Sequence, residues 1–274
     1  MATCDRVRFG GTISGSTLSG GTSVESQAIG LLDGHADLLG RPSWKGGNWN
    51  QLGRDGETYR FDKSLSQRYM TLTVATFDRN FEGLITEADR CDQLDVNIDT
   101  LLGLIDGRFI IERDVLGETR WIQAELAADV TAVSGPVFGQ NNSAYTFLIP
   151  VRCPYPLWQS ETLNQTVISG AGTISNAGNA RIPNAEFVFS GDGTFTNSDG
   201  DEEGNSYGMT ISGSGAAVTV DVGAGTVVES GSPADNTFTA DKAWWMRLGR
   251  TGDIATVNVT STVSVTVNHR DQWF

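Results

Sequence analysis

The sequence lacks the long hydrophobic runs and the paired cysteines of membrane-anchored and disulfide-rich proteins. No window approaches the roughly 18 consecutive apolar residues of a membrane-spanning helix. The first residues, MATCDRVRFGGTISG, contain neither an apolar core nor a small-residue cleavage site. Cys4, Cys91 and Cys153 form an odd set without a CxxC pair, which argues against a disulfide framework or a zinc site. We therefore expect that the chain does not insert into a membrane. We also expect that it is synthesised in the reducing cytoplasm of a cell.

Residues for nucleophilic catalysis are also scarce. The chain has only two histidines, His35 and His269, and no GxSxG elbow. There is no Walker-type phosphate loop, and no helical pattern follows Gly191-Asp192-Gly193, as a dinucleotide site would require. Carboxylates are plentiful, but none forms a recognisable acid–base pair. We expect no catalytic residues and no cofactor, and keep a polysaccharide hydrolase as the least favoured alternative.

Positive charge is in short supply. The chain has 19 Lys and Arg against 33 Asp and Glu, a formal net charge of −14. Such a surface repels phosphate backbones, so nucleic acid is not an expected partner. The acidic turn 197–203 resembles the front of a calcium loop, but Gly208 stands where the bidentate Glu would be. The sequence therefore predicts a solvated turn there and no metal site.

Glycine, by contrast, is abundant, with 33 residues in 274. That is above the usual share of about 7% and is typical of a turn-rich β-protein. Two prolines in Cys153-Pro154-Tyr155-Pro156-Leu157-Trp158 interrupt any helix or strand. They predict a domain boundary, with one domain over 1–158 and a second over 159–274.

The first half is predicted to combine β-strands with one helix. The expected strands are 7–9, 58–61, 69–77, 108–112, 120–126 and 145–152. A helix is expected at about 86–106, because apolar residues recur there at spacings of three and four. This expected packing face consists of Cys91, Leu94, Ile98, Leu101 and Ile105. The opposite face is assigned Asp92, Asp95, Asn97 and Asp99. The apolar stripe should cover a sheet, and a further hypothesis places the helix at a subunit contact.

The second half shows no helical period. Short strands with turn signals between them are expected at 163–169, 185–190, 207–212, 217–222, 226–229, 244–248, 254–259 and 263–268. This spacing is typical of a β-sandwich or jelly roll. Residues 40–56 and 127–144 are predicted loops of the first half.

The adjacent Trp244 and Trp245 are possible carbohydrate contacts, since exposed tryptophans stack on sugar rings. Neighbouring residues in a strand face opposite ways, so at most one of the two would be free. An alternative function is therefore a carbohydrate-binding module that contacts the host cell wall through the second domain.

Several stretches together resemble the distal tail protein family of long-tailed, non-contractile bacteriophages, often called phage minor tail proteins. The passage 152–158 is similar to the family's P-x-W stretch between domains. Residues 176–183, followed by 186–191, resemble the opening of its second domain, N-x-G-N … P … strand … G. Residues 245–253 resemble its L-x-x-G-x-N turn, with Asp253 where Asn is usual. Residues 263–270 and then Trp273 are similar to its last strand and aromatic end.

The resemblance implies a mainly β fold and a structural role. The N-terminal domain would be a sandwich or split-barrel-like domain with one amphipathic helix, and the second a galectin-like, jelly-roll-type sandwich. Six copies would form a ring at the tail tip of the virion, joining the tail tube to the tail-associated hub, baseplate and tape measure proteins. The second domain would lie outside the ring and could contact a host glycan. The family has no catalytic residues to transfer, and loops 40–56 and 127–144 are hypothetical ring contacts.

Overall fold

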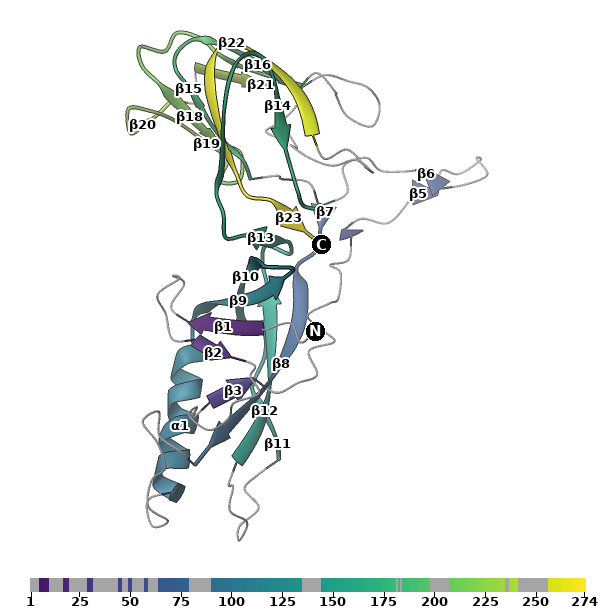
Figure 1. Cartoon of the computed structure of the whole chain (residues 1–274), viewed down its shortest axis with the longest axis vertical. Helices are drawn as coiled ribbons and strands as arrows, with labels where there is room; N and C mark the ends of the chain where they lie inside the picture. The colour runs from purple at the N-terminus through teal and green to yellow at the C-terminus, as the bar shows by residue number, and fades with distance from the viewer. Residues whose placement is uncertain are drawn as a thin grey trace. The chain divides into compact units, whose positions relative to one another are not determined.

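The computed structural model describes residues 5–9, 17–19, 29–31, 44–45, 49–50, 57–58, 64–78, 90–134, 144–180, 182, 184–197, 207–234, 237–240 and 256–274. The chain divides into two compact units, Met1–Pro156 and Leu157–Phe274. Both are built from antiparallel strands, and the described residues contain one α-helix (Figure 1). The prediction of a mainly β protein with one amphipathic helix is confirmed.

An antiparallel sheet forms most of the N-terminal unit. Its strands lie in the order β2-β1-β9-β10-β12-β8-β3, and β11 pairs with β12. Their bounds are β1 Asp5–Phe9, β2 Thr17–Ser19, β3 Ile29–Leu31, β8 Arg68–Phe77, β9 Arg108–Val115, β10 Glu118–Leu126, β11 Thr131–Ser134 and β12 Ala144–Cys153. Two short pairs, β4 (Trp44–Lys45) with β7 (Ser64–Leu65) and β5 (Trp49–Asn50) with β6 (Glu57–Thr58), stand outside this sheet. The predicted loops 40–56 and 127–144 therefore contain short strands.

Strand β8, which lies between β12 and the edge strand β3, follows the period-two pattern expected from its sequence. Met70, Leu72 and Val74 are buried, whereas Tyr69 between Arg68 and Met70 is 66% exposed. Alternate side chains of a strand point to opposite faces. The buried side chains therefore define a core face of the sheet, and Tyr69 marks its outer face.

Helix α1 (Arg90–Ile105) packs against β8 on the core face. The predicted helix spanned 86–106, and residues 86–89 lie outside the described residues. In Figure 1 the helix runs along one side of the sheet of the N-terminal unit. Leu94, Leu101 and Ile105 are almost fully buried there, so the apolar stripe supplies part of the core.

The C-terminal unit is one long antiparallel sheet folded into two layers. Its strand order is β20-β19-β18-β15-β22-β16-β17-β21, with β14 along the other edge of β22. The bounds are β14 Asn164–Ser175, β15 Glu186–Phe189, β16 Gly193–Asn197, β17 Tyr207–Ile211, β18 Val218–Asp221, β19 Thr226–Glu229, β20 Ser232–Pro233, β21 Phe238–Ala240 and β22 Thr256–His269. Two short strands, β13 (Trp158–Ser160) and β23 (Gln272–Trp273), pair with each other.

The fold into two layers occurs where β14 and β22 change register. The pairing passes from Ile168↔Val265 to Gly170↔Ser261, so β22 carries a bulge at this point. Gly170 has a φ of 86°, a left-handed conformation that glycine adopts without a Cβ clash. On one side of the bulge β22 pairs with β15, and on the other with β16.

A single hydrophobic core lies between these layers. Phe187 of β15 and Phe195 of β16 are fully buried and meet edge-to-face with ring centroids 5.2 Å apart. The core cluster includes residues from both sides of the bulge, such as Ile168 and Val257. This arrangement is the sandwich expected from the strand spacing.

Several strand predictions for the C-terminal unit differ from the structure. The strands expected at 254–259 and 263–268 are one strand, β22, because Ser261 is buried inside the ladder. Its Oγ lies 2.7 Å from the carbonyl oxygen of Val263, within the bulge. The strand expected at 163–169 continues as β14 to Ser175. The strands that were not expected are β13, β16, β20, β21 and β23. The strand expected at 244–248 lies outside the described residues.

Candidate functional site

The predicted packing face of α1 is largely turned inward. Leu94, Leu101 and Ile105 are buried, and Ile98 is partly buried. The side chain of Cys91 lies outside the described residues. These residues hold the helix on the core face of the sheet and are therefore not available to a partner.

Asn97 was assigned to the wrong face of the helix. It is three residues after Leu94 and four before Leu101, which places it in the apolar stripe. Its side chain is only 2% exposed. The Asn97 amide donates to the carbonyl oxygen of Phe77 over 2.6 Å and accepts from the Gln93 amide over 3.0 Å. Asn97 thus links α1 to the end of β8 by a partly buried hydrogen bond.

The outer helix face consists of Asp92, Asp95, Val96, Asp99 and Leu102, all exposed. Val96 and Leu102 are 54% and 41% exposed. Three carboxylates thus surround two apolar side chains on a regular helix. An exposed apolar centre with a charged rim is typical of protein contacts, in which the apolar part becomes buried.

A cross-strand row of side chains lies on the outer face of the same sheet. Arg108 of β9 pairs with Glu125 of β10, Glu125 with Arg152 of β12, and Arg152 with Tyr69 of β8. The Nε of Arg152 lies 2.6 Å from one Glu125 carboxylate oxygen, and the Nε of Arg108 lies 3.8 Å from the other. One carboxylate thus serves two guanidinium groups, so the row carries a net positive charge. Sequence reasoning missed this row because cross-strand pairing is not local in sequence.

At the end of the β8–β12 strand pair, Arg68 of β8 lies opposite Cys153 of β12 on the core face. Burial is the largest influence on Arg68 and lowers its pKa to about 10. Of the smaller influences, Cys153 raises this pKa and Arg113 lowers it. Burial raises the pKa of the Cys153 thiol to about 12, against the smaller effect of Arg68. The thiol is therefore protonated at neutral pH and is a poor nucleophile, since the thiolate is the reactive form.

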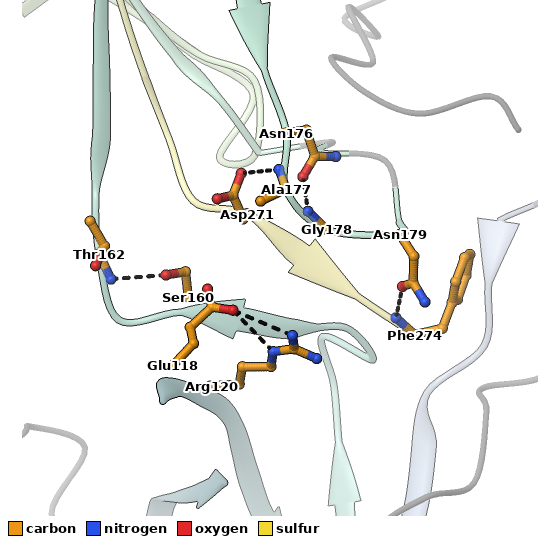
Figure 2. A network of polar contacts seen from close by, with 10 residues as sticks. All are labelled: Glu118, Arg120, Ser160, Thr162, Asn176, Ala177, Gly178, Asn179, Asp271 and Phe274. Atoms are coloured by element: carbon orange, nitrogen blue, oxygen red, sulfur yellow. Dashed lines mark hydrogen bonds and ion pairs between the residues drawn. The ribbon is translucent and has the colours of Figure 1, made fainter. Parts of the chain in front are cut away.

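The stretch 176–179, quoted above for its family resemblance, holds the C-terminal segment (Figure 2). Asn176 accepts a hydrogen bond from the Gly178 amide over 2.9 Å. Asp271 accepts from the Ala177 amide over 3.1 Å, and Asn179 accepts from the Phe274 amide over 3.0 Å. We call Asn176–Asn179 with Asp271 and Phe274 the C-terminal clasp. Its role is structural, because its polar atoms are used in bonds within the unit.

Two carboxylates organise a turn at the edge of the C-terminal unit. Asp192 accepts from the amides of Gly213 and Ser214 over 2.7 and 2.8 Å, and from the Ser214 hydroxyl over 2.7 Å. Glu229 accepts from the next two amides, Gly215 and Ala216, over 2.6 and 2.8 Å. The Ser214 hydroxyl, followed by the two amides, lowers the pKa of Asp192. The carboxylates thus accept the hydrogen bonds of the backbone amides of residues 213–216, which lie outside the strands.

Several predicted features lie outside the described residues, among them Trp244, Trp245 and His35. The second histidine, His269, is buried, and its Nε2 lies 2.9 Å from the carbonyl oxygen of Ser175. Within the described ranges, no group of three or more His, Cys, Asp or Glu could hold a metal ion. Among the helical residues that the structure describes, none form a helix long and apolar enough to span a membrane.

Comparison with known proteins gives structural likeness only. No protein-family model and no curated protein matches the sequence. The crystal structure of SPP1 Dit (gp 19.1) aligns with 98% of this chain and 99% of its own, with a TM-score of 0.59 and 16% identity. That protein is described as a paradigm of the hub adsorption apparatus in phages that infect Gram-positive bacteria.

Two structures of the phage P2 baseplate in its activated conformation also match. The calcium form has a TM-score of 0.47 at 10% identity, over 99% of this chain and 98% of that chain. The strontium form has a TM-score of 0.46 at 10% identity, over 98% of each chain. Of these three structures, SPP1 Dit has the likeness that bears on the fold, and its alignment extends over both units.

Proposed function

We propose that this chain is a structural protein of a bacteriophage tail tip. One observation carries the proposal: a solved phage hub protein shares the fold over nearly the full length of both chains. The sequence stretches at 152–158 and 176–183, which resemble the distal tail protein family, support it independently. In this proposal the chain is not an enzyme and works through its surfaces.

In the proposed assembly, six copies form a ring between the tail tube and the tail-associated hub, baseplate and tape measure proteins. A ring of identical subunits needs two different, complementary patches on each subunit. The N-terminal unit offers two exposed surfaces of different chemistry, the outer helix face and the cross-strand row. The C-terminal unit would then lie outside the ring as a galectin-like sandwich.

The position of the protein in the virion is the direct test of this proposal. Antibodies raised against the purified chain should label phage particles at the distal end of the tail, as seen by gold-labelled electron microscopy. Particles produced without this chain should lack complete tails. Labelling along the tail shaft or on the capsid, or complete tails without the chain, would contradict the proposal.

A further inference from the structure

The N-terminal unit carries exposed charges of opposite sign on two different surfaces. The outer helix face carries Asp92, Asp95 and Asp99. Exposed basic side chains occur elsewhere: among the residues whose side chains the structure describes, Arg108 and Arg152 are the only exposed basic ones. Both belong to the cross-strand row. The described part of the unit thus has one acidic surface and one basic surface.

These two surfaces lie on opposite sides of the sheet. α1 packs on the core face, where Met70 and Leu72 of β8 are buried. Tyr69 alternates with these residues along β8 and therefore points to the outer face. Arg152, directly opposite Tyr69 in the register, shares that face. One subunit can therefore present the acidic surface to one neighbour and the basic surface to the other.

Each surface also has an exposed apolar or aromatic element. On the helix these are Val96 and Leu102, at 54% and 41% exposure. On the sheet it is the ring of Tyr69, at 66% exposure. Tyrosine and arginine are enriched in the buried centres of protein interfaces, where their apolar parts pack and their polar ends bind. The row therefore has the composition of a contact surface.

The net charge of the chain limits which surfaces of two copies can meet. At −14, two subunits repel each other overall, and opposite charges that face one another at the contact offset this repulsion. The Glu125 carboxylate is shared by two guanidinium groups, which have ten N–H donors between them by the ordinary count of about five each. The row therefore retains positive charge and donors for carboxylates of a second copy. The outer helix face supplies three carboxylates, those of Asp92, Asp95 and Asp99.

We infer that neighbouring subunits contact each other through the outer helix face of one copy and the cross-strand row of the next. The occupant of each surface is a second copy of this chain. Because the two surfaces differ and lie on opposite sides, the contact is head-to-tail, and such contacts form a ring when the rotation between neighbouring copies closes. The inference rests on the proposed ring and specifies which residues form it.

Charge reversal on each surface tests this contact. The helix variant carries Asp95→Lys and Asp99→Lys, and the row variant carries Arg108→Glu and Arg152→Glu. Each variant alone has two surfaces of the same sign, so each should lose the ring and elute as a monomer of about 29.3 kDa. An equimolar mixture should recover the ring, because every contact in an alternating ring again joins opposite charges. The measurement is light scattering after size-exclusion chromatography.

Recovery on mixing separates a lost contact from a lost fold, since two misfolded chains do not restore each other. A matched control carries Asp129→Lys with Glu161→Lys. It makes the same charge change as the helix variant, at two exposed carboxylates outside both surfaces. It should assemble like the wild type. Monomers that stay monomeric on mixing would overturn the contact, as would a control that also loses the ring.

The wild-type chain in the same experiment distinguishes this inference from the proposed function. A wild-type ring that both single-surface variants still form overturns the contact and leaves the proposed function standing. A wild-type chain that stays monomeric, with or without the tail tube protein, contradicts the proposed ring and the contact with it. Variants that keep the ring but lose a different tail protein would assign the surfaces to that protein instead.

Discussion

At the scale of single residues, Gly178 occupies the tightest position among the described glycines. A Cβ at this position would lie 1.9 Å from the carbonyl oxygen of Gln272. Gly178→Ala should therefore force Asn176–Asn179 away from β23 and lower the free energy of unfolding by about 1–3 kcal/mol, the usual cost of overpacking. Chemical denaturation measures the change.

The matched control for that substitution is Gly103→Ala. Gly103 lies in α1, and a Cβ there meets nothing within 4 Å. Alanine is the better helix former, so this variant should gain about 0.5–1 kcal/mol. The same chemical change should thus have opposite signs at the two sites. Equal effects at both would show that the space around Gly178 is not the cause.

A second residue-scale prediction concerns Leu116 at the hairpin between β9 and β10. Leu116 and Gly117 have φ values of 54° and 85°, and Leu116 is fully exposed. Positive φ at both central residues is the type I′ turn, which favours Asn-Gly. Leu116→Asn should raise the free energy of unfolding by about 1 kcal/mol, the strain of a left-handed residue. Leu163→Asn, at an exposed leucine not in the left-handed region, is the control and should show no such gain.

At the scale of elements, the join between α1 and β8 depends on Asn97. Asn97→Ala removes the bond to the Phe77 carbonyl and leaves that partly buried acceptor without its helix partner. The free energy of unfolding should fall by about 1–3 kcal/mol. Asp99→Ala, two residues further and exposed, should change it by no more than about 0.5 kcal/mol. Thermal or denaturant unfolding of the two variants distinguishes them, and equal losses would contradict the role of the partly buried bond.

The turn held by Asp192 should depend on pH. A carboxyl with a lowered pKa contributes its stabilisation above the ordinary carboxyl range, and loses it as the pH falls through the folded-state pKa. The stability gap between wild type and Asp192→Asn should therefore be present at neutral pH and close in acid. Denaturation at a series of pH values measures the gap. A gap that persists in acid would mean that the hydrogen bonds to Ser214 and Gly213 do not depend on the charge.

The helix could be predicted from the sequence, whereas the pairing of side chains across strands could not. The stripe Leu94, Leu101 and Ile105 was predictable because helical period is a local property. Asn97 was missed because its polarity was given more weight than its spacing. The cross-strand row could not be predicted, since it joins Tyr69 to Arg108 through pairings of β8, β12, β10 and β9 that only the folded sheet defines. The long β22 appeared as two strands because Thr260-Ser261-Thr262 resembles a turn in composition.

At the scale of the whole molecule, the chain combines two compact β units with different properties. The N-terminal unit exposes an acidic helix face and a basic row, whereas the described polar groups of the clasp serve the C-terminal unit internally. This division supports a subunit that assembles through its first unit. It agrees with the proposed ring and with the head-to-tail contact inferred above.

The mass of the purified wild-type chain in solution, measured by light scattering after size-exclusion chromatography, tests the central claim most directly. The proposed ring predicts a closed assembly of six copies of 29.3 kDa, alone or after addition of the tail tube protein, and ring-shaped particles by negative stain. A single species of 29.3 kDa under both conditions would contradict it.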